Sequence, residues 1–306
     1  MTETNPETIE RDVMEYDVVV VGGGPAGLSC AIRLKQLKPD LEICILEKGA
    51  EIGAHALSGA VIEPGPLDEL LPAWRDEFKG VCVPAGRDEF SFLTRTRKQK
   101  FPLPPQMKNH GNFIVSLCNL NAYLGTKAEE VGCDVFPGFA AAKPLIDDSG
   151  AVCGVQIGDM GLQKDGTPGT NFAPGPEIRA KTTVAAEGCR GSLSKVLINH
   201  FRLDAGKSPQ TYGGGFKELW QLPEGRVEPG FIGHTVGWPL DGRTYGGSFL
   251  YHLNDNRIYV GFVVGLDYPD PRLKPFDAFQ QFKNHPSMRG LFEGGELLGY
   301  GARTLI

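Results

Sequence analysis

No apolar run in the sequence reaches the roughly 18 residues that a membrane-spanning helix needs, so no transmembrane helix is expected. The chain has no excess of positive charge either: 31 Lys and Arg residues face 37 Asp and Glu residues, for a net charge of −6. Nucleic-acid-binding proteins normally carry a basic surface, so this balance argues against DNA or RNA as a partner. The polar, acidic N-terminus resembles neither a signal peptide nor a transit peptide, and we expect residues 1–13 to form a disordered lead-in.

Cysteine pairs with metal-site spacing are also missing from the sequence. The seven cysteines are scattered singly, which is typical of reduced thiols, and no metal ligands are predicted in this chain. Glycine and proline are frequent by contrast, with 41 and 23 residues, and they cluster at turns without a period. This pattern predicts many tight turns and close approaches of backbone to ligand.

Two short apolar segments near the N-terminus flank a glycine turn. Residues 16–21 (YDVVVV) and 41–46 (LEICIL) predict β-strands that are buried on both faces, and residues 28–37 predict the helix between them. This strand–turn–helix–strand order is typical of a doubly wound parallel sheet. The predicted fold class is therefore α/β, with a Rossmann-type domain at the N-terminus.

The rest of the chain changes character after residue 208. Before it, we expect strands around a turn at 90–101, a helix at 118–131, a strand at 133–136, a hairpin of 140–146 and 152–157, a loop at 159–176, a strand at 178–185 and a helix at 191–199. After it, aromatic residues and glycines alternate, as in TYGGSFLYHL and IYVGFVVGL. This alternation predicts a second domain of antiparallel strands.

The glycine turn matches the pattern G-x-G-x-x-G at Gly22, Gly24 and Gly27. In this motif the first glycine makes a tight turn, the second lets the backbone approach a diphosphate, and the third packs the helix on the strand. The helix N-terminus then offers N–H groups and a partial positive charge to the phosphates. Glu47 ends the second strand about 20 residues later, where a carboxylate binds ribose hydroxyls. The pattern predicts a dinucleotide site; the alternative is a purely structural turn.

Two features favour FAD over NAD as the cofactor. Residues 48–60 are rich in Gly, Ala and Ser, which leaves room for a ribityl chain and a flavin ring. Glu187 and Gly188 follow a buried strand, as an acid–glycine pair does in flavin monooxygenases and their relatives; the alternative is an ordinary N-terminal turn of a helix. The residues predicted to bind the cofactor are Val21, Gly22, Gly23, Gly24, Pro25, Ala26, Gly27, Leu28, Glu47, Lys48, Gly53, Glu187 and Gly188.

With these residues placed, the chain resembles the electron-transfer flavoprotein:ubiquinone oxidoreductase family. The resemblance is carried by long stretches that include LEKGAEIGAHALSGAVIEPG, DMGLQKDG, PQTYGGGFKELW and HTVGWPLDGRTYGGSFLYHL. It implies an FAD-binding domain of the flavin-monooxygenase/glutathione-reductase kind with an inserted antiparallel β-sheet domain. It also implies an enzyme that takes electrons from electron-transfer flavoprotein and reduces ubiquinone at a membrane surface.

The same resemblance implies a division of the chain into two parts. Residues 14–72 and 110–200 would bind FAD, and residues 73–109 and 201–306 would bind the quinone. The quinone-contacting glycines match Gly246 and Gly247, where missing side chains would let a flat ring approach between aromatic residues; the alternative is a glycine bulge with core aromatics. A membrane-dipping stretch matches residues 52–72, whose apolar side chains could equally belong to a core. No catalytic residue is assigned, although His55 and His252 are considered for proton transfer.

Two departures from the family pattern shape the expectation for this chain. The family holds a 4Fe–4S cluster with four cysteines, and no such set occurs in this sequence. Ser116 stands where the wider flavin class often has an arginine. We therefore expect the N-terminal half of such an enzyme, incomplete at its C-terminus, on the cytoplasmic face of a bacterial inner membrane or on the mitochondrial inner membrane of a eukaryote. The alternatives are a geranylgeranyl-reductase-like or aromatic-hydroxylase-like FAD oxidoreductase and a non-catalytic flavin-binding fragment.

Overall fold

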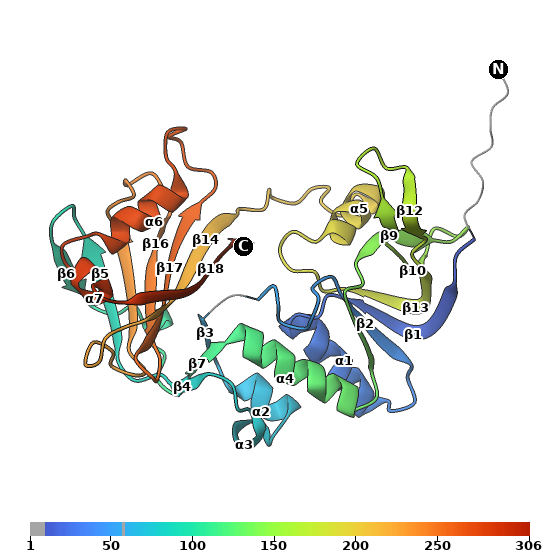
Figure 1. The fold of residues 1–306 in the computed structure, drawn as a ribbon, viewed down its shortest axis with the longest axis horizontal. Helices are drawn as coiled ribbons and strands as arrows, with labels where there is room; N and C mark the ends of the chain where they lie inside the picture. The colour runs from blue at the N-terminus through green and yellow to red at the C-terminus, as the bar shows by residue number, and fades with distance from the viewer. Residues whose placement is uncertain (1–9, 57–58) are drawn as a thin grey trace. The chain divides into compact units, whose positions relative to one another are not determined.

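The computed structural model describes residues 10–56 and 59–306, which form two compact units (Figure 1). Unit 1 contains the chain up to His55 together with Asn121–Lys207, and unit 2 contains Ala56–Leu120 together with Ser208–Ile306. Residues 59–72 and 110–120 thus belong to unit 2 rather than to unit 1, and within unit 2 β3 (Gly59–Ile62) pairs with β7 (Phe113–Ser116). The assignment of FAD and quinone to stretches of the chain stays a prediction. Among the helices of the described ranges, none combines the length and apolarity required to traverse a membrane.

Unit 1 is built on a six-stranded sheet with the order β8-β2-β1-β13-β10-β9. Its elements are β1 (Val13–Val21), α1 (Pro25–Leu37), β2 (Ile43–Glu47), most of α4 (Leu117–Glu130), β8 (Asp134–Pro137), β9 (Ala141–Ile146), β10 (Val152–Ile157), β11 (Met160–Leu162), β12 (Pro168–Ala173), β13 (Glu177–Ala185) and α5 (Ser192–Phe201). The central strand β1 is parallel to both β2 and β13. Residues 18–21 at its end are buried, as the unbroken run of valines predicted.

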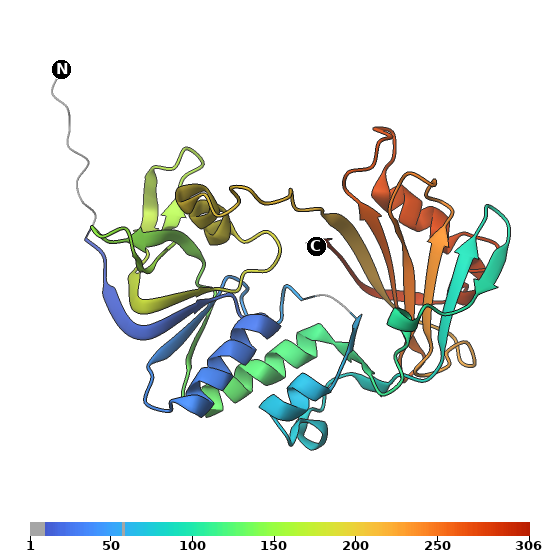
Figure 2. The same cartoon turned by 180° about the vertical axis from the view of Figure 1, so that it is seen from behind.

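The two faces of this sheet carry different helices. Figures 1 and 2 show α1 and α4 on one side, and α5 on the other. On the α5 side, Val21 and Leu46 pack in one buried cluster with Val155 and with Leu193 of the helix. The predicted Rossmann-type strand–turn–helix–strand unit is therefore present, and its strands end together at one edge of the sheet.

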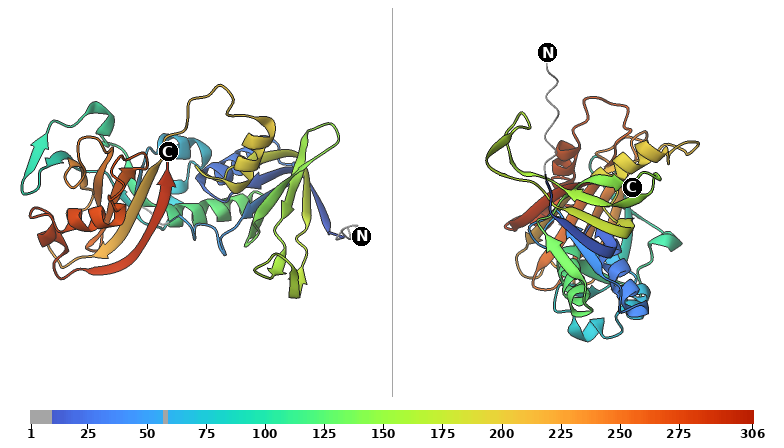
Figure 3. Two further views of the ribbon diagram at one scale, coloured as in Figure 1. Left: turned by 90° about the horizontal axis from the view of Figure 1, so that it is seen from above. Right: turned by 90° about the vertical axis from the view of Figure 1, so that its right-hand side faces the viewer.

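Two expectations for unit 1 are wrong. Residues 10–13 are ordered rather than part of a lead-in, because Arg11 forms an ion pair with Asp159 and β1 begins at Val13; the remaining residues, 1–9, lie outside the described ranges. The expected loop at 159–176 contains the antiparallel hairpin of β11 and β12 (Figure 3). Its turn is held by Asp165, whose carboxylate accepts hydrogen bonds from the backbone N–H and the hydroxyl of Thr167.

Unit 2 is built on a seven-stranded sheet with the order β18-β14-β17-β16-β15-β5-β6. Its strands are β5 (Asp88–Leu93), β6 (Lys98–Phe101), β14 (Gly213–Gln221), β15 (Ile232–Gly237), β16 (Gly246–His252), β17 (Arg257–Gly265) and β18 (Glu296–Leu305). Neighbouring strands are antiparallel, as expected, except that β5 and β15 are parallel, so the sheet is mixed. This pairing joins residues far apart in the sequence, which local alternation does not reveal.

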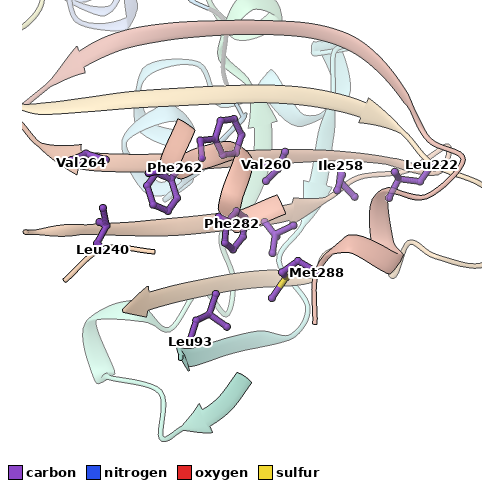
Figure 4. Close-up of a cluster of buried hydrophobic side chains, with 12 residues drawn as sticks. Leu93, Leu222, Leu240, Ile258, Val260, Phe262, Val264, Phe282 and Met288 are labelled. Atoms are coloured by element: carbon purple, nitrogen blue, oxygen red, sulfur yellow. The ribbon is translucent and has the colours of Figure 1, made fainter. Parts of the chain in front are cut away.

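The main core of unit 2 lies on one face of this sheet, beneath α6 (Pro275–Lys283) and α7 (Arg289–Phe292). Alternate residues of β17, such as Val260 and Phe262, point toward Phe279 and Phe282 of α6 (Figure 4). On the other face, Tyr259 packs with Val83 and Ile114 of a small sheet, β3-β7-β4. The remaining elements are α2 (Gly65–Leu70), α3 (Trp74–Glu77), β4 (Cys82–Pro84) and the short 3-10 helix Pro105–Met107.

Candidate functional site

Three segments that are distant in the sequence meet at the carboxyl edge of the unit 1 sheet. Gly22 follows β1, Glu47 ends β2 and Glu187 follows β13. The N–H of Gly22 donates to the carbonyl of Leu46 at 2.8 Å, and the N–H of Ala186 donates to the carbonyl of Val21 at 2.8 Å. In open parallel sheets, ligands bind outside the carboxyl ends of the strands, so this edge is the candidate nucleotide site.

The three motif glycines have three different surroundings. Gly22 has a φ of +116°, and a Cβ there would lie 2.4 Å from the carbonyl oxygen of Ala186. A Cβ at Gly27 would lie 2.1 Å from the carbonyl oxygen of Gly22, so this glycine lets the helix approach the strand. A Cβ at Gly24 would meet nothing within 4 Å. The turn and the close packing are as expected, and Gly24 borders space that a ligand can occupy.

The start of α1 leaves backbone N–H groups for a ligand. Gly24 is the N-cap residue and provides no side-chain cap, and Pro25 occupies the first turn. Pro25 and Ala26 are exposed, whereas Val21 and Leu28 are buried in the sheet and under the helix. Uncapped amides at a helix N-terminus attract anions, which suits a diphosphate.

The carboxylate of Glu47 is held against the glycine turn. Its Oε2 accepts a hydrogen bond from the N–H of Gly23 at 3.0 Å, and its Oε1 accepts one from Gly49 at 2.7 Å. His55 Nδ1 lies 3.7 Å from the same Oε1. Each carboxylate oxygen has two lone pairs, so the fixed carboxylate retains capacity for ribose hydroxyls. Lys48 beside it is exposed, and Gly53 is a buried glycine with a φ of +93°.

Glu187 and Gly188, which were expected to contact the cofactor together, have different surroundings. The carboxylate of Glu187 accepts hydrogen bonds from the N–H groups of Leu193 and Ser194, at 3.1 and 2.7 Å, so it caps α5. This geometry corresponds to the alternative of a helix N-terminal turn. Gly188 has a φ of +79°, and a Cβ there would meet nothing within 4 Å. Contact of either residue with a cofactor stays a prediction.

Gly246 and Gly247 begin β16 in unit 2, and the sheet itself requires them. A Cβ at Gly246 would lie 2.2 Å from the carbonyl oxygen of Val263, and one at Gly247 would lie 2.3 Å from that of Thr235. We expected glycine here because it would leave open space for a flat ring. At the Cβ positions of both glycines that space is instead filled by backbone carbonyl oxygens. Quinone contact at the two glycines stays a prediction.

The histidine considered beside these glycines has a structural role. His252 is buried, and its Nδ1 accepts a hydrogen bond from the N–H of Glu228 at 3.0 Å. Burial lowers the pKa of His252 to about 4, so the ring is neutral near pH 7. Trp238 belongs to the core beneath α6, and Tyr251 stacks on Phe249 with ring centroids 4.7 Å apart. The aromatic residues near Gly246 thus serve two different faces of the sheet.

Lys217 and His234 lie on the Tyr251 face of the sheet, and no local sequence signal marks either residue. Their positions emerge only when β14 and β15 are paired with the strands between them. Ser116, where the wider flavin class often has an arginine, is buried in β7.

The large apolar side chains described in the stretch at 52–72, which could belong to a core or contact a membrane, are neither fully buried nor fully exposed. Leu57 lies outside the described residues. The other large apolar side chains from Ala56 onward are partly buried, namely Val61, Ile62, Leu67, Leu70 and Leu71.

Comparison with known proteins identifies the family. Residues 212–305 match the model described as "ETF-QO, ubiquinone-binding", and residues 1–63 match the Thi4 family model. The chain is 50% identical to the mitochondrial electron transfer flavoprotein-ubiquinone oxidoreductase of Arabidopsis thaliana, over 96% of this chain and 47% of that protein. It is also 50% identical to the human protein of the same name, over 97% and 49%. The chain belongs to the electron transfer flavoprotein-ubiquinone oxidoreductase family.

The chain spans about half the length of the family members that it matches. Solved structures show a shared α/β fold at low identity. A geranylgeranyl bacteriochlorophyll reductase-like protein from Thermoplasma acidophilum has a TM-score of 0.66 at 18% identity, covering 95% of this chain and 66% of that chain. The myxobacterial halogenase CndH, described as FAD-dependent, has a TM-score of 0.64 at 16% identity, covering 96% and 63%. The predicted flavoprotein fold is confirmed.

Proposed function

We propose that the protein containing this chain accepts electrons from electron-transfer flavoprotein and reduces ubiquinone to ubiquinol through FAD. The observation that carries the proposal is the extent of the similarity. The 50% identity runs through both units, and the part matched by the ubiquinone-binding model lies in unit 2. A protein that had kept only a flavin-binding fold would not need to conserve the second unit to this degree.

FAD would be held by the carboxyl edge of the unit 1 sheet. The space beside Gly24 and the uncapped first turn of α1 fit a diphosphate, and the fixed carboxylate of Glu47 fits a ribose. Gly188 offers exposed backbone at the same edge. When bound, FAD supplies the redox chemistry, since it can take up two electrons and release them one at a time or together.

The quinone would be bound by unit 2, with Gly246 and Gly247 among its contacts. Reduction of ubiquinone to ubiquinol adds two electrons and two protons to the ring. The neutral, buried His252 is poorly suited to supply a proton, because its Nδ1 already accepts a hydrogen bond and its pKa is low. The protons are therefore proposed to reach the quinone from solvent.

The cysteine ligands of the family's 4Fe–4S cluster are proposed to lie outside this chain. A 4Fe–4S cluster needs a group of cysteine ligands, and within residues 10–56 and 59–306 no three His, Cys, Asp or Glu side chains are grouped to hold a metal. Quinone with a long tail resides in lipid, so the protein is proposed to be peripheral on the membrane that holds it. The relatives are named as mitochondrial, and in a bacterium the equivalent place is the cytoplasmic face of the inner membrane.

A reconstituted assay tests the proposed function. The full-length protein, loaded with FAD, is mixed with enzymatically reduced electron-transfer flavoprotein and a short-tailed ubiquinone, and ubiquinol is measured. We expect quinol to form only with the FAD-loaded protein. Quinol formation no faster than in the flavin-free control would refute the proposal, and reduction of a geranylgeranyl substrate instead would support a reductase of the other flavoprotein class.

A further inference from the structure

One row of residues crosses the unit 2 sheet on the face opposite α6. His234 pairs with Phe249, Phe249 pairs with Gly261, and Gly261 pairs with Lys217. Because the neighbouring residues of β17 point into the α6 core, this row must face the other way. Gly261 has no side chain, and the Phe249 ring occupies its place: a Cβ there would lie 2.0 Å from the ring. The ring thus extends toward Lys217, whose Nζ is 5.5 Å from the ring centroid.

The ammonium of Lys217 has few interactions among the described residues. Its hydrogen bond to the carbonyl of Gly59 is long, at 3.4 Å, and within the described ranges no carboxylate pairs with it. Lys283 on the opposite face shows the contrast, because its Nζ lies 2.7 Å from Glu218. Partial burial lowers the pKa of Lys217. A partly buried cation that has no carboxylate beside it among the described residues costs stability, which makes Lys217 a candidate for a role in binding or chemistry.

The same row holds a second polar group, the imidazole of His234. The Nδ1 of His234 is buried, and the described residues supply no hydrogen bond to it. The His234 ring stands edge-on to Tyr251, with centroids 5.9 Å apart. Two groups with unused hydrogen-bonding capacity, a lysine and a histidine, therefore flank one stacked aromatic pair, Phe249 and Tyr251. Aromatic surface with polar groups at its margins suits a flat ring that carries carbonyl oxygens.

We propose that Lys217 contacts the quinone directly, donating a hydrogen bond from its ammonium to one carbonyl oxygen of the ring. This inference rests on the proposed function and names a residue that the family resemblance did not provide. Lys217, His234 and Phe249 all lie in the segment matched by the ubiquinone-binding model. Gly247 lies in the next row on the same face of the sheet. It pairs with Val263, which in turn pairs with Gly215.

The chemistry explains why a cation is useful at this place. The two electrons supplied through FAD convert two carbonyl groups into two hydroxyl groups once two protons are added. Negative charge builds on the carbonyl oxygens before the protons arrive, and an ammonium interacts more strongly with that charge than with the neutral carbonyl. The interaction therefore favours the transition state over the bound quinone. The ammonium of Lys217 orients the ring and is unchanged at the end of the reaction.

The test compares three variants of the FAD-loaded full-length protein with the wild type. Lys217→Met removes the charge at similar length, Lys217→Arg keeps a charged donor, and Lys274→Met removes an exposed lysine from the same unit. Reduced electron-transfer flavoprotein is the donor, and the acceptors are a short-tailed ubiquinone and hexacyanoferrate(III), which has no carbonyl oxygen. Flavin content is measured for each protein.

For Lys217→Met we expect kcat/KM with ubiquinone to fall about 10- to 100-fold, the range for losing a charge-assisted hydrogen bond. Its flavin content and its rate with hexacyanoferrate should match the wild type. Lys217→Arg should recover most of the quinone rate, and Lys274→Met should lose none of it. Equal loss with both acceptors, or loss of flavin, would show a structural role for Lys217 and overturn the inference.

The inference and the proposed function fail in different ways. A wild-type protein that reduces ubiquinone, together with a Lys217→Met variant that does so equally well, refutes the inference and leaves the function intact. A flavin-loaded wild-type protein that reduces hexacyanoferrate but not ubiquinone refutes the function, and the inference with it.

Discussion

Gly24 and Gly27 lie three residues apart in one turn, and a side chain would meet different surroundings at the two positions. Gly24 has an ordinary extended backbone, with φ −88° and ψ 179°, and open space where a Cβ would stand. We expect Gly24→Ala to leave the stability of the apoprotein within about 0.5 kcal/mol of the wild type. The same methyl group would stand where a diphosphate approaches, so FAD affinity should fall at least tenfold. Urea unfolding and titration by flavin fluorescence measure the two effects.

Gly27→Ala is the matched variant, and its effect should be the reverse. Its methyl group would lie 2.1 Å from the carbonyl oxygen of Gly22, so the helix must move away from the strand. Overpacking of this kind costs about 1–3 kcal/mol, which the apoprotein should lose even without FAD. If instead Gly24→Ala bound FAD as tightly as the wild type, no diphosphate would be approaching at Gly24.

His252 links the stability of unit 2 to pH. Burial lowers its pKa from 6.5 to about 4, so between these values the unfolded chain takes up a proton that the folded chain refuses. Stability should therefore be complete above pH 6.5 and decline as pH falls toward 4, by up to roughly 3 kcal/mol. His252→Asn can still accept a hydrogen bond but does not titrate, so unfolding free energies from pH 4.5 to 7.5 should show a smaller decline. The exposed His110→Asn should behave as the wild type.

At the scale of elements, α6 is fixed to its sheet by one buried ion pair as well as by its phenylalanines. Lys283 Nζ lies 2.7 Å from Glu218 of β14, and the indole of Trp220 donates to the same carboxylate at 2.7 Å. Removing one partner leaves a buried charge, so Lys283→Met should cost about 3–5 kcal/mol of unfolding free energy.

The double variant Lys283→Met with Glu218→Gln separates the lost ion pair from lost packing. Since it removes both charges, it should recover part of the stability, as urea unfolding would show. Lys274→Met, at the exposed start of the same helix, serves as the control and should change stability little. Equal stability of Lys283→Met and the wild type would mean that the phenylalanines alone hold α6.

The elements that the sequence predicted are those whose signal is local. The run of valines in β1, the glycine turn and the alternation in β16 and β17 each specify their own structure. The hairpin of β11 and β12 was missed because both strands are largely exposed and carry no apolar alternation. The parallel pairing of β5 with β15 was missed because nothing within either strand encodes its distant partner.

The same distinction applies to the candidate site. Gly22, Gly24 and Gly27 were predictable because a turn imposes fixed positions on its own residues. The capping role of Glu187 depends on a helix that begins five residues later. The sequence therefore left two interpretations of Glu187 open, cofactor contact and a helix N-terminal turn. Lys217 could not be found at all from its neighbours, because its environment is made by two other strands, β16 and β17.

At the scale of the whole molecule, the proposed attachment to a membrane must be reconciled with an acidic chain. The chain carries a net charge of −6, so anionic lipid would repel it rather than attract it. The large apolar side chains described in the proposed membrane stretch, such as Ile62 and Leu67, are partly buried. Attachment through this stretch would therefore draw on apolar burial, which salt does not screen.

Vesicle sedimentation of the full-length protein tests this origin of membrane binding. We expect binding to neutral phosphatidylcholine vesicles to be at least as strong as binding to vesicles with anionic lipid. We also expect no release when salt rises from about 10 mM to about 500 mM, because screening acts on charges alone. Leu67→Gln should weaken binding, whereas Leu37→Gln, at an exposed leucine of unit 1, should not. Release by salt would trace attachment to a basic surface, and unchanged binding of Leu67→Gln would remove the stretch at 52–72 from the membrane contact.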